Sequence, residues 1–536
     1  MWPQNYFFAG GSLFWSTVVA FLPVLALLLA IGIWHVSAWK ASLIGLLAAF
    51  AVALFGCRMP ISLALSAAAY GGAFGIFPIF WIVYWAIVLY RITVETGKFE
   101  VLKDSIAHLT ADRGIQALLI AFAFGAFLEG AAGFGTPVAV GAAILAGLGF
   151  SPFQAATICL LANTAPVAFG SIGIPLVTLS ATTGLPLMDL SANTGRIVAP
   201  LSTMIPAYLI LVMGGVRELR RVGLAAIVCG VTFGLAQILV SNLSGPYLTD
   251  ILASLSSILA IVILLKFWRP TREVDTIDLS PRRYSAAQLL IAWSPYILLV
   301  IFVLTWSFTG VKSVLHRVTF SVPWPGLHNM VEQLPPVVEH ARPYAALYRV
   351  DWLAASGTSC GLAAIIAGFV LRLSVFQILG ICVKSARQLL PAFASFVFVL
   401  ALAFLMNYSG ATATLGLAFA STGKVFPFCS ALLGWLGVFL TGSDTSANAL
   451  FGNLQAITAN RLGLDPVLLA SANSAGGVMG KMISLQSIAV ASAATGLKSS
   501  DEPKLFRFTL RHSIILASAV GVVTLLYSYV VPHWVR

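Results

Sequence analysis

Hydrophobic residues run through this chain in long stretches, which short polar or basic segments separate. Because these stretches are continuously apolar rather than alternating, they predict membrane helices and exclude membrane strands. A helix needs about 20 apolar residues to cross a bilayer, and several stretches are shorter or rich in glycine. We therefore predict an all-α polytopic membrane protein, a single domain over residues 1–536, with about 12–14 transmembrane helices and some broken or re-entrant ones. The apolar segments lie at 14–34, 41–56, 61–77, 78–90, 115–133, 136–150, 152–170, 197–213, 223–241, 251–268, 289–307, 352–371, 388–406, 425–441, 445–457, 466–482 and 512–531.

Composition agrees with a membrane location. Of 536 residues, 59% are hydrophobic and 9% are charged, whereas a typical soluble domain has about 25% charged residues. The net charge of +12 would suggest nucleic-acid binding in a soluble protein. Here the basic residues fall in short loops, so we expect the lipid bilayer and no nucleic acid as a partner. The seven histidines show no ligand spacing, so we expect no metal site, and no cofactor is indicated.

The basic clusters predict how the chain is oriented. They lie at 91–113, 217–221, 266–283, 372–387 and 498–511. Placing all of them in the cytoplasm puts the segments Asn242–Asp250 and Phe308–Asp351 outside. We expect the long segment 308–351 to form an external cap over the helices rather than a separate soluble domain.

Two related sequences interrupt the apolar pattern. GAFLEGAAGFGTPVAV (125–140) and GVFLTGSDTSANALFG (437–452) share G-x-F-L-x-G, and a polar A-N-[ST]-A sequence follows each about thirty residues later. The repeat regions are 115–175 and 425–490. In the predicted orientation the two motifs run in opposite directions, unless residues 407–424 add a crossing. Inverted repeats with broken, polar helices are typical of the central site of a secondary transporter.

Each motif carries one acid, Glu129 or Asp444, and we interpret these as the only acids at mid-membrane depth. Acids are costly in hydrocarbon and normally persist there for a function. We predict that both take part in proton coupling. Glu129 is the favoured proton carrier, because its glycine and alanine neighbours offer no compensating charge. Asp444 has many hydroxyl neighbours and a possible cationic partner, Lys481, and is expected to stay ionised and organise the site.

Substrate contacts are expected from the polar and glycine residues around the two acids. Thr136 and Pro137 are typical of an N-cap and a first helical position, where a half-helix would present free N–H groups to an anion. Close helix packing through glycine, satisfied amides at kinks, and extension of the Lys481 side chain to the membrane surface are the structural alternatives. The predicted substrate-binding residues are Gly130, Gly133, Thr136, Asn163, Thr164, Ser443, Thr445, Asn448, Asn473, Ser474 and Lys481.

Four stretches resemble the signature sequences of the bacterial L-lactate permease family. They are FLEGAAGFGTPVA, LANTAPVAFGSIGIP, FLTGSDTSANALF and GGVMGKMIS, and the resemblance extends over nearly the whole chain. It implies a proton symporter for L-lactate, D-lactate or glycolate in the bacterial plasma (inner) membrane. The small hydroxymonocarboxylate and protons would be its partners. One departure is Leu485, where the family pattern usually has proline, which leaves a kink after Lys481 open.

Three other functions are compatible with the sequence. A sodium-coupled carboxylate transporter or a passive anion channel would share the composition and the broken helices. An intramembrane aspartyl protease is a weaker alternative suggested by Gly442-Ser443-Asp444, because it needs two facing aspartates and Glu129 is interpreted as the only other buried acid. The preferred substrate and the oligomeric state are not predicted.

Overall fold

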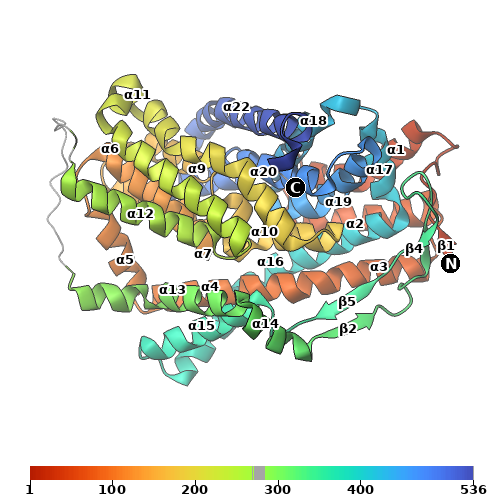
Figure 1. Ribbon diagram of the computed structural model, residues 1–536, viewed down its shortest axis with the longest axis horizontal. Helices are drawn as coiled ribbons and strands as arrows, with labels where there is room; N and C mark the ends of the chain where they lie inside the picture. The colour runs from red at the N-terminus through yellow and green to blue at the C-terminus, as the bar shows by residue number, and fades with distance from the viewer. Residues whose placement is uncertain (134, 269, 271–283, 535–536) are drawn as a thin grey trace.

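The molecule is a multi-pass bundle of helices (Figure 1). The computed structural model describes residues 1–133, 135–268, 270 and 284–534, so most of the basic cluster predicted at 266–283 lies outside the described residues. Within these ranges eleven helices are long and apolar enough to cross a membrane, or twelve if a bent pair counts as one span. This confirms the predicted all-α polytopic class.

The longest helix, α11 (Leu187–Leu243), doubles back on itself at Gly215. The backbone of Gly215 has φ +68°, and the two arms pack antiparallel. The Ser191 hydroxyl donates to the Ser241 carbonyl at 2.9 Å, and Gly230 lies directly against the backbone of Thr203. Counting both arms as spans gives twelve or thirteen, within the predicted range.

Long helices make up much of the bundle. Residues 61–95 form one apolar run of 35 residues that kinks at Phe77, before Pro78, where the predicted segments 61–77 and 78–90 meet. The long helix α16 packs against α2, α3 and α4. These elements are α1 (Leu13–Gly32), α2 (Ala38–Ala51), η1 (Val52–Gly56), α3 (Ile61–Phe74), η2 (Gly75–Phe80), α4 (Trp81–Glu95), α5 (Lys98–Ala107), α12 (Thr249–Phe267), α13 (Ala286–Ser307), α15 (Ser356–Val370), α16 (Val375–Ser409) and α22 (Glu502–Tyr529).

Two similar units form the centre of the molecule, and each consists of a helical hairpin followed by an interrupted helix. The first unit has its hairpin turn between α7 and α8, and it bends by 62° after α9. Its elements are α6 (Arg113–Gln116), η3 (Ala117–Phe124), α7 (Gly125–Ala131), α8 (Thr136–Gly147), α9 (Pro152–Ala162), η4 (Val167–Phe169) and α10 (Gly170–Thr183).

The second unit repeats this plan. Its hairpin tip is at Gly442-Ser443, and its helix is interrupted at residues 482–484, where Ser484 caps the next helix. The interruption therefore forms although Leu485 replaces the usual proline of the family pattern. The elements are α18 (Phe426–Thr441), α19 (Asp444–Leu462), α20 (Pro466–Lys481) and α21 (Leu485–Thr495).

The two hairpins enter the molecule from opposite ends. The base of the second hairpin lies at the end that carries the N-terminus and the strands, where Arg461 donates to the Pro336 carbonyl at 3.1 Å. The base of the first lies beside α5 and α6 at the other end (Figure 1). The intervening helix α17 (Ala411–Ala420) has ten residues, about 15 Å, and is too short to cross a bilayer. Each unit also packs on the other, α10 on α19 and α21 on α8.

Glycines let α18 and α20 approach with their backbones in contact. A side chain at Gly434 would meet the carbonyl of Asn473, and one at Gly476 would meet the carbonyl of Ala431. Such close approach is the usual role of small residues between membrane helices. Glycines 476, 477 and 480 lie inside a regular helix because packing rather than bending requires them, so Asn473-Ser474 does not mark a kink.

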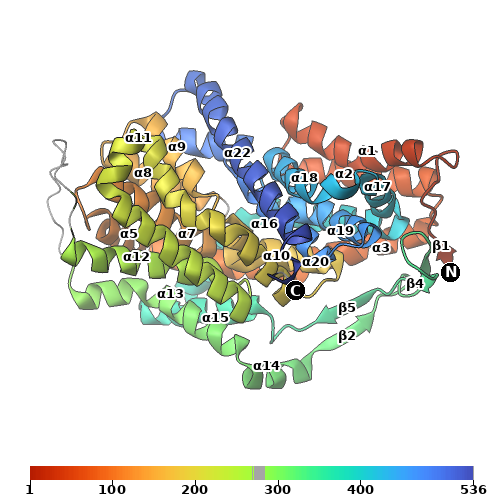
Figure 2. The same ribbon diagram turned by 45° about the horizontal axis from the view of Figure 1, so that its top comes forward.

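The long segment 308–351 covers the ends of α3 and α16 and folds with the N-terminus (Figure 2). Trp324 donates to the Ser66 carbonyl at 3.1 Å, and Tyr408 donates to the Ala345 carbonyl at 2.7 Å. Its short strands were not predicted. The strands are β1 (Trp2–Pro3), which pairs with β3 (Val331–Gln333), then β4 (Arg342–Pro343), and β2 (Phe320–Pro323), which pairs with β5 (Leu347–Val350). The segment also contains α14 (Thr309–Leu315) and the 3₁₀ turn η5 (His316–Val318). Three further 3₁₀ turns lie elsewhere in the chain: η6 (Gly423–Val425), η7 (Ser499–Asp501) and η8 (Pro532–Trp534).

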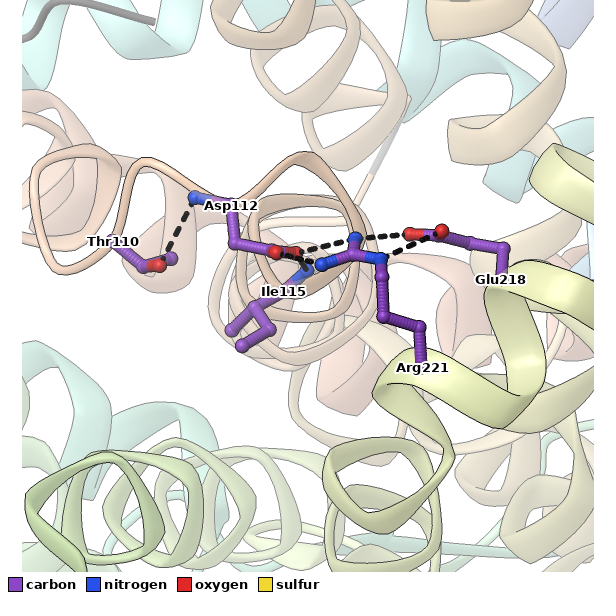
Figure 3. A network of polar contacts seen from close by, with 5 residues as sticks. All are labelled: Thr110, Asp112, Ile115, Glu218 and Arg221. Atoms are coloured by element: carbon purple, nitrogen blue, oxygen red, sulfur yellow. Dashed lines mark hydrogen bonds and ion pairs between the residues drawn. The ribbon is translucent and has the colours of Figure 1, made fainter. Parts of the chain in front are cut away.

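An ion cluster fixes the base of the first hairpin to α11 (Figure 3). The Arg221 guanidinium bridges Asp112 and Glu218, and all three side chains are close to fully buried. Asp112 also caps α6 by accepting from the Ile115 backbone N–H at 3.1 Å. The cluster thus links two helical hairpins that are distant in sequence.

Replacing Arg221 by Met should strongly destabilise the protein. It leaves two mostly buried carboxylates without their cation, and breaking a buried pair in this way typically costs about 3–5 kcal/mol. The measurement is the thermal unfolding midpoint in detergent, with Lys504→Met as the control. Lys504 pairs with Asp501 but is largely exposed, and an exposed pair is worth about 0–1 kcal/mol. Equal midpoints for the two variants would contradict the structural role of the cluster.

Candidate functional site

A cavity of about 280 Å³ lies where the two units meet α2 and α16. It is smaller than the pockets of roughly 300–1,000 Å³ that hold drug-sized ligands, so its size suits a small molecule. Five of the predicted site residues line it: Glu129, Ser443, Asp444, Thr445 and Lys481. The structure thus brings both predicted acids and the predicted lysine to one cavity.

Asp444 lies at the start of α19, where Ser443 is the N-cap. Its Oδ2 atom accepts from the Ser474 hydroxyl at 2.6 Å and from the Asn448 amide at 3.3 Å. Gly477 lies against the other oxygen, and that close approach leaves no room for a side chain. This carboxylate is therefore held in one orientation by α19 and α20.

A chain of amides supports Asp444 from behind. Asn473 donates to Asn448 Oδ1 at 2.9 Å, and Gln455 donates to Asn473 Oδ1 at 3.1 Å. Asn448 also donates to the Pro175 carbonyl of α10 at 3.1 Å. Asn448, Asn473 and Ser474 do not line the cavity, so their geometry is that of positioning residues rather than of substrate contacts.

Lys481 occupies the last turn of α20 beside the tip of the second hairpin. Its side chain is 9% exposed and donates from Nζ to the Gly442 carbonyl at 2.5 Å. It interacts electrostatically with both Glu129 and Asp444. The lysine therefore faces the cavity and does not extend to the membrane surface.

Glu129 reaches the cavity from α7 and is 5% exposed. Gly170 lies against it, so that a side chain at 170 would meet Glu129 Oε1. The Asn163 amide faces the carboxyl group, but neither Asn163 side-chain atom nor Glu129 Oε2 has a geometric hydrogen-bond partner. Glu129 thus lacks the fixed hydrogen bonds that Asp444 has.

The cavity floor includes a left-handed turn at the start of α10. Ser171, Ile172 and Gly173 all have positive φ, and the Ser171 hydroxyl donates to the Ala132 carbonyl at 3.0 Å. This contact ties the turn to the tip of the first hairpin, where Gly133 leaves the space that Ser171 occupies. A β-branched residue such as Ile172 is strained in this region, and such strain is concentrated at functional sites.

The remaining predicted residues lie behind the cavity wall. Gly135 rather than Thr136 is the N-cap of α8, so the predicted cap is wrong by one position. The Thr164 hydroxyl donates to the Leu161 carbonyl of its own turn at 2.7 Å. Gly130 packs against the start of α12. Gly130, Thr136 and Thr164 do not line the cavity.

A third buried acid lies at the level of Glu129, although Glu129 and Asp444 were interpreted as the only acids at mid-membrane depth. Asp250, the second residue of α12, is 1% exposed and lies beside Glu129. Both of its oxygens are buried without a hydrogen-bond partner. Its position at the edge of an apolar run made it look like part of an external loop.

Sequence reasoning also missed several lining residues. They are Trp39 at the start of α2, Ser395 on α16 and Gln486 on α21, together with the turn at Ser171. No motif marks Trp39, which lies between two apolar segments, or Ser395, which lies within the segment 388–406. GSIGIP (170–175) was already part of a quoted signature, and its glycines were the available signal.

The charges of the site cannot balance when all groups are ionised. Three buried carboxylates, Glu129, Asp250 and Asp444, stand against one ammonium, Lys481. Charges in so dry an environment are costly unless paired. A bound anion would add one more negative charge, so it would require protons or another cation to accompany it.

Comparison with known proteins shows the family of this chain. The family model for L-lactate permease matches residues 16–531. The chain belongs to the L-lactate permease family. It is 41% identical to the glycolate permease GlcA of Escherichia coli strain K12 and 42% identical to the L-lactate permease of the same strain, in each case over 99% of this chain and 98% of the relative. It is also 42% identical to the L-lactate permease of Bacillus subtilis strain 168, over 99% of this chain and the whole relative.

Membership of the L-lactate permease family makes this chain a membrane transporter rather than an enzyme. The protease alternative is therefore wrong. A protease of this type needs two facing aspartates, and the second buried aspartate, Asp250, lies beside Glu129.

Proposed function

We propose that this chain carries L-lactate and related 2-hydroxymonocarboxylates, including D-lactate and glycolate, across the bacterial inner membrane together with protons. The observation that supports this best is the shared cavity of Glu129, Asp444 and Lys481. An ammonium group and the N-terminus of α19 suit a carboxylate, and hydroxyls at Ser443 and Thr445 suit a 2-hydroxyl group. The names of the relatives agree with this substrate class.

The two acids have different roles in this proposal. Asp444 is held by Ser474 and Asn448 and organises the site beside Lys481. Glu129 lacks such fixed hydrogen bonds and carries the coupling proton. Protonation of Glu129 removes one negative charge when the substrate carboxylate enters, so that anion and proton cross together.

The cavity is open towards the turn between α1 and α2. Ser37, Ala38 and Pro391 are exposed lining residues on that side. Since α1 starts at the strand end and has 20 residues, this turn lies about 30 Å away from the strands. In the orientation given by the basic clusters, we propose that this state faces the cytoplasm.

Transport by the purified protein in proteoliposomes tests the proposal. An inward pH gradient should drive uphill uptake of labelled L-lactate and glycolate without sodium, and counterflow should proceed without any gradient. Uptake that requires sodium would favour the sodium-coupled carboxylate transporter. Equilibration without uphill accumulation would favour the passive anion channel.

A further inference from the structure

Asp250 is a buried acid outside the cavity lining. It belongs to the first turn of α12, directly after the loop that joins α11 to α12. The side chain is 1% exposed, and neither oxygen has a hydrogen-bond partner. An uncompensated carboxylate in this position is costly, so packing alone does not explain an aspartate here.

The nearest acidic neighbour of Asp250 is Glu129. A side chain at Gly130, the residue after Glu129, would lie 2.8 Å from Asp250 Cβ. Only glycine allows α7 and α12 to approach this closely, so Asp250 lies against the backbone next to Glu129, and the two carboxyl groups interact electrostatically. Both groups have at least one buried oxygen without a partner. Two like charges this close in a dry environment repel strongly, which favours one proton between them.

Asp250 lies on the side of Glu129 away from the cavity. It is not a lining residue, whereas Glu129 is. The loop before it packs Pro246 against Gly173, in the left-handed turn that forms the cavity floor. Tyr247 is the other titratable group of this loop, and its hydroxyl faces Ser356 on α15 rather than Asp250. The carboxyl pair therefore spans the wall between this loop and the cavity.

We propose that Asp250 and Glu129 share one proton and that Asp250 passes the coupling proton between the loop 244–249 and Glu129. This rests on the proposed function, in which transport is coupled to protons. A proton from water binds Asp250, moves to Glu129 as the pair exchanges it, and leaves on the other side of the membrane after the substrate has crossed. No other reactant is needed.

Asp250→Asn tests the relay in proteoliposomes that contain a trapped pH indicator. Substrate-driven proton influx should fall at least tenfold, and uphill accumulation should fall to a ratio near one, while counterflow stays within twofold of the unchanged protein. Asp189→Asn is the matched control, because Asp189 is exposed at the nearby start of α11. Unchanged proton influx in Asp250→Asn with normal accumulation would overturn the proposal. If the unchanged protein itself accumulates substrate without proton influx, the proposed coupling fails instead.

Carbodiimide labelling of the unchanged protein gives a second test that does not depend on a variant folding. The reagent modifies protonated carboxyl groups in apolar surroundings. We expect one adduct per molecule, distributed between the peptides that contain Glu129 and Asp250, and slower labelling when L-lactate is present. Adducts on neither residue, or on both in the same molecule, would exclude a shared proton.

Discussion

Glu129→Gln should abolish uphill accumulation of L-lactate while leaving counterflow largely intact. Glutamine keeps the size of the side chain beside Gly170 but cannot carry and release a proton. A gradient of one pH unit supplies about 1.4 kcal/mol, which corresponds to about tenfold accumulation for one proton per anion. The unchanged protein should approach that ratio, whereas the variant should remain near one. Labelled substrate taken up under an imposed pH gradient gives the measurement.

The control for this variant is Glu339→Gln. Glu339 is an exposed acid in the segment between β3 and β4 and does not line the cavity. Its neutralisation should therefore not change the accumulation ratio. Counterflow in both variants shows that the protein is folded and binds substrate. Undiminished uphill uptake by Glu129→Gln would remove Glu129 from the coupling mechanism.

The break within each of the two repeat motifs was predictable because glycine and turn-forming residues mark it. The sequence around Gly133 and Pro137 predicted the start of a half-helix, and α8 begins at Thr136 after α7 ends at Ala131. The tip at Gly442-Ser443 was predicted in the same way. Since both tips carry an acid, the sequence also indicated which charges would meet, although it gave no distance between them.

Glycine has two uses in membrane helices, and the sequence does not separate them. Glycines 476 and 477 follow Asn473-Ser474 and resemble a helix breaker, but α20 continues through them because α18 packs against its backbone. The distinction depends on which helix lies opposite, and that is a tertiary property. The real interruption, at residues 482–484, contains no glycine or proline.

The other missed features also depend on tertiary contacts. Asp250 follows a loop without basic residues, where an acid is unremarkable. Its importance comes from α7, whose Gly130 allows α12 to approach Glu129 closely. Trp39 and Ser395 reach the cavity because α2 and α16 pack against the two units, and neither residue belongs to a repeat motif that would mark it.

Lys481→Met should reduce the apparent affinity for L-lactate by at least 30-fold. Lys481 is the one ammonium group among the lining residues that the structure describes, and without it a substrate carboxylate would face Glu129 and Asp444 alone. Loss of one partner from a buried charge pair costs about 2–5 kcal/mol, and each 1.4 kcal/mol is tenfold in affinity. The half-saturating substrate concentration in counterflow measures the effect, with Lys424→Met as the control because Lys424 is exposed near the start of α18. An unchanged half-saturation in Lys481→Met would mean that the carboxylate binds elsewhere, whereas a loss confined to proton-driven accumulation would assign Lys481 to the movement of protons.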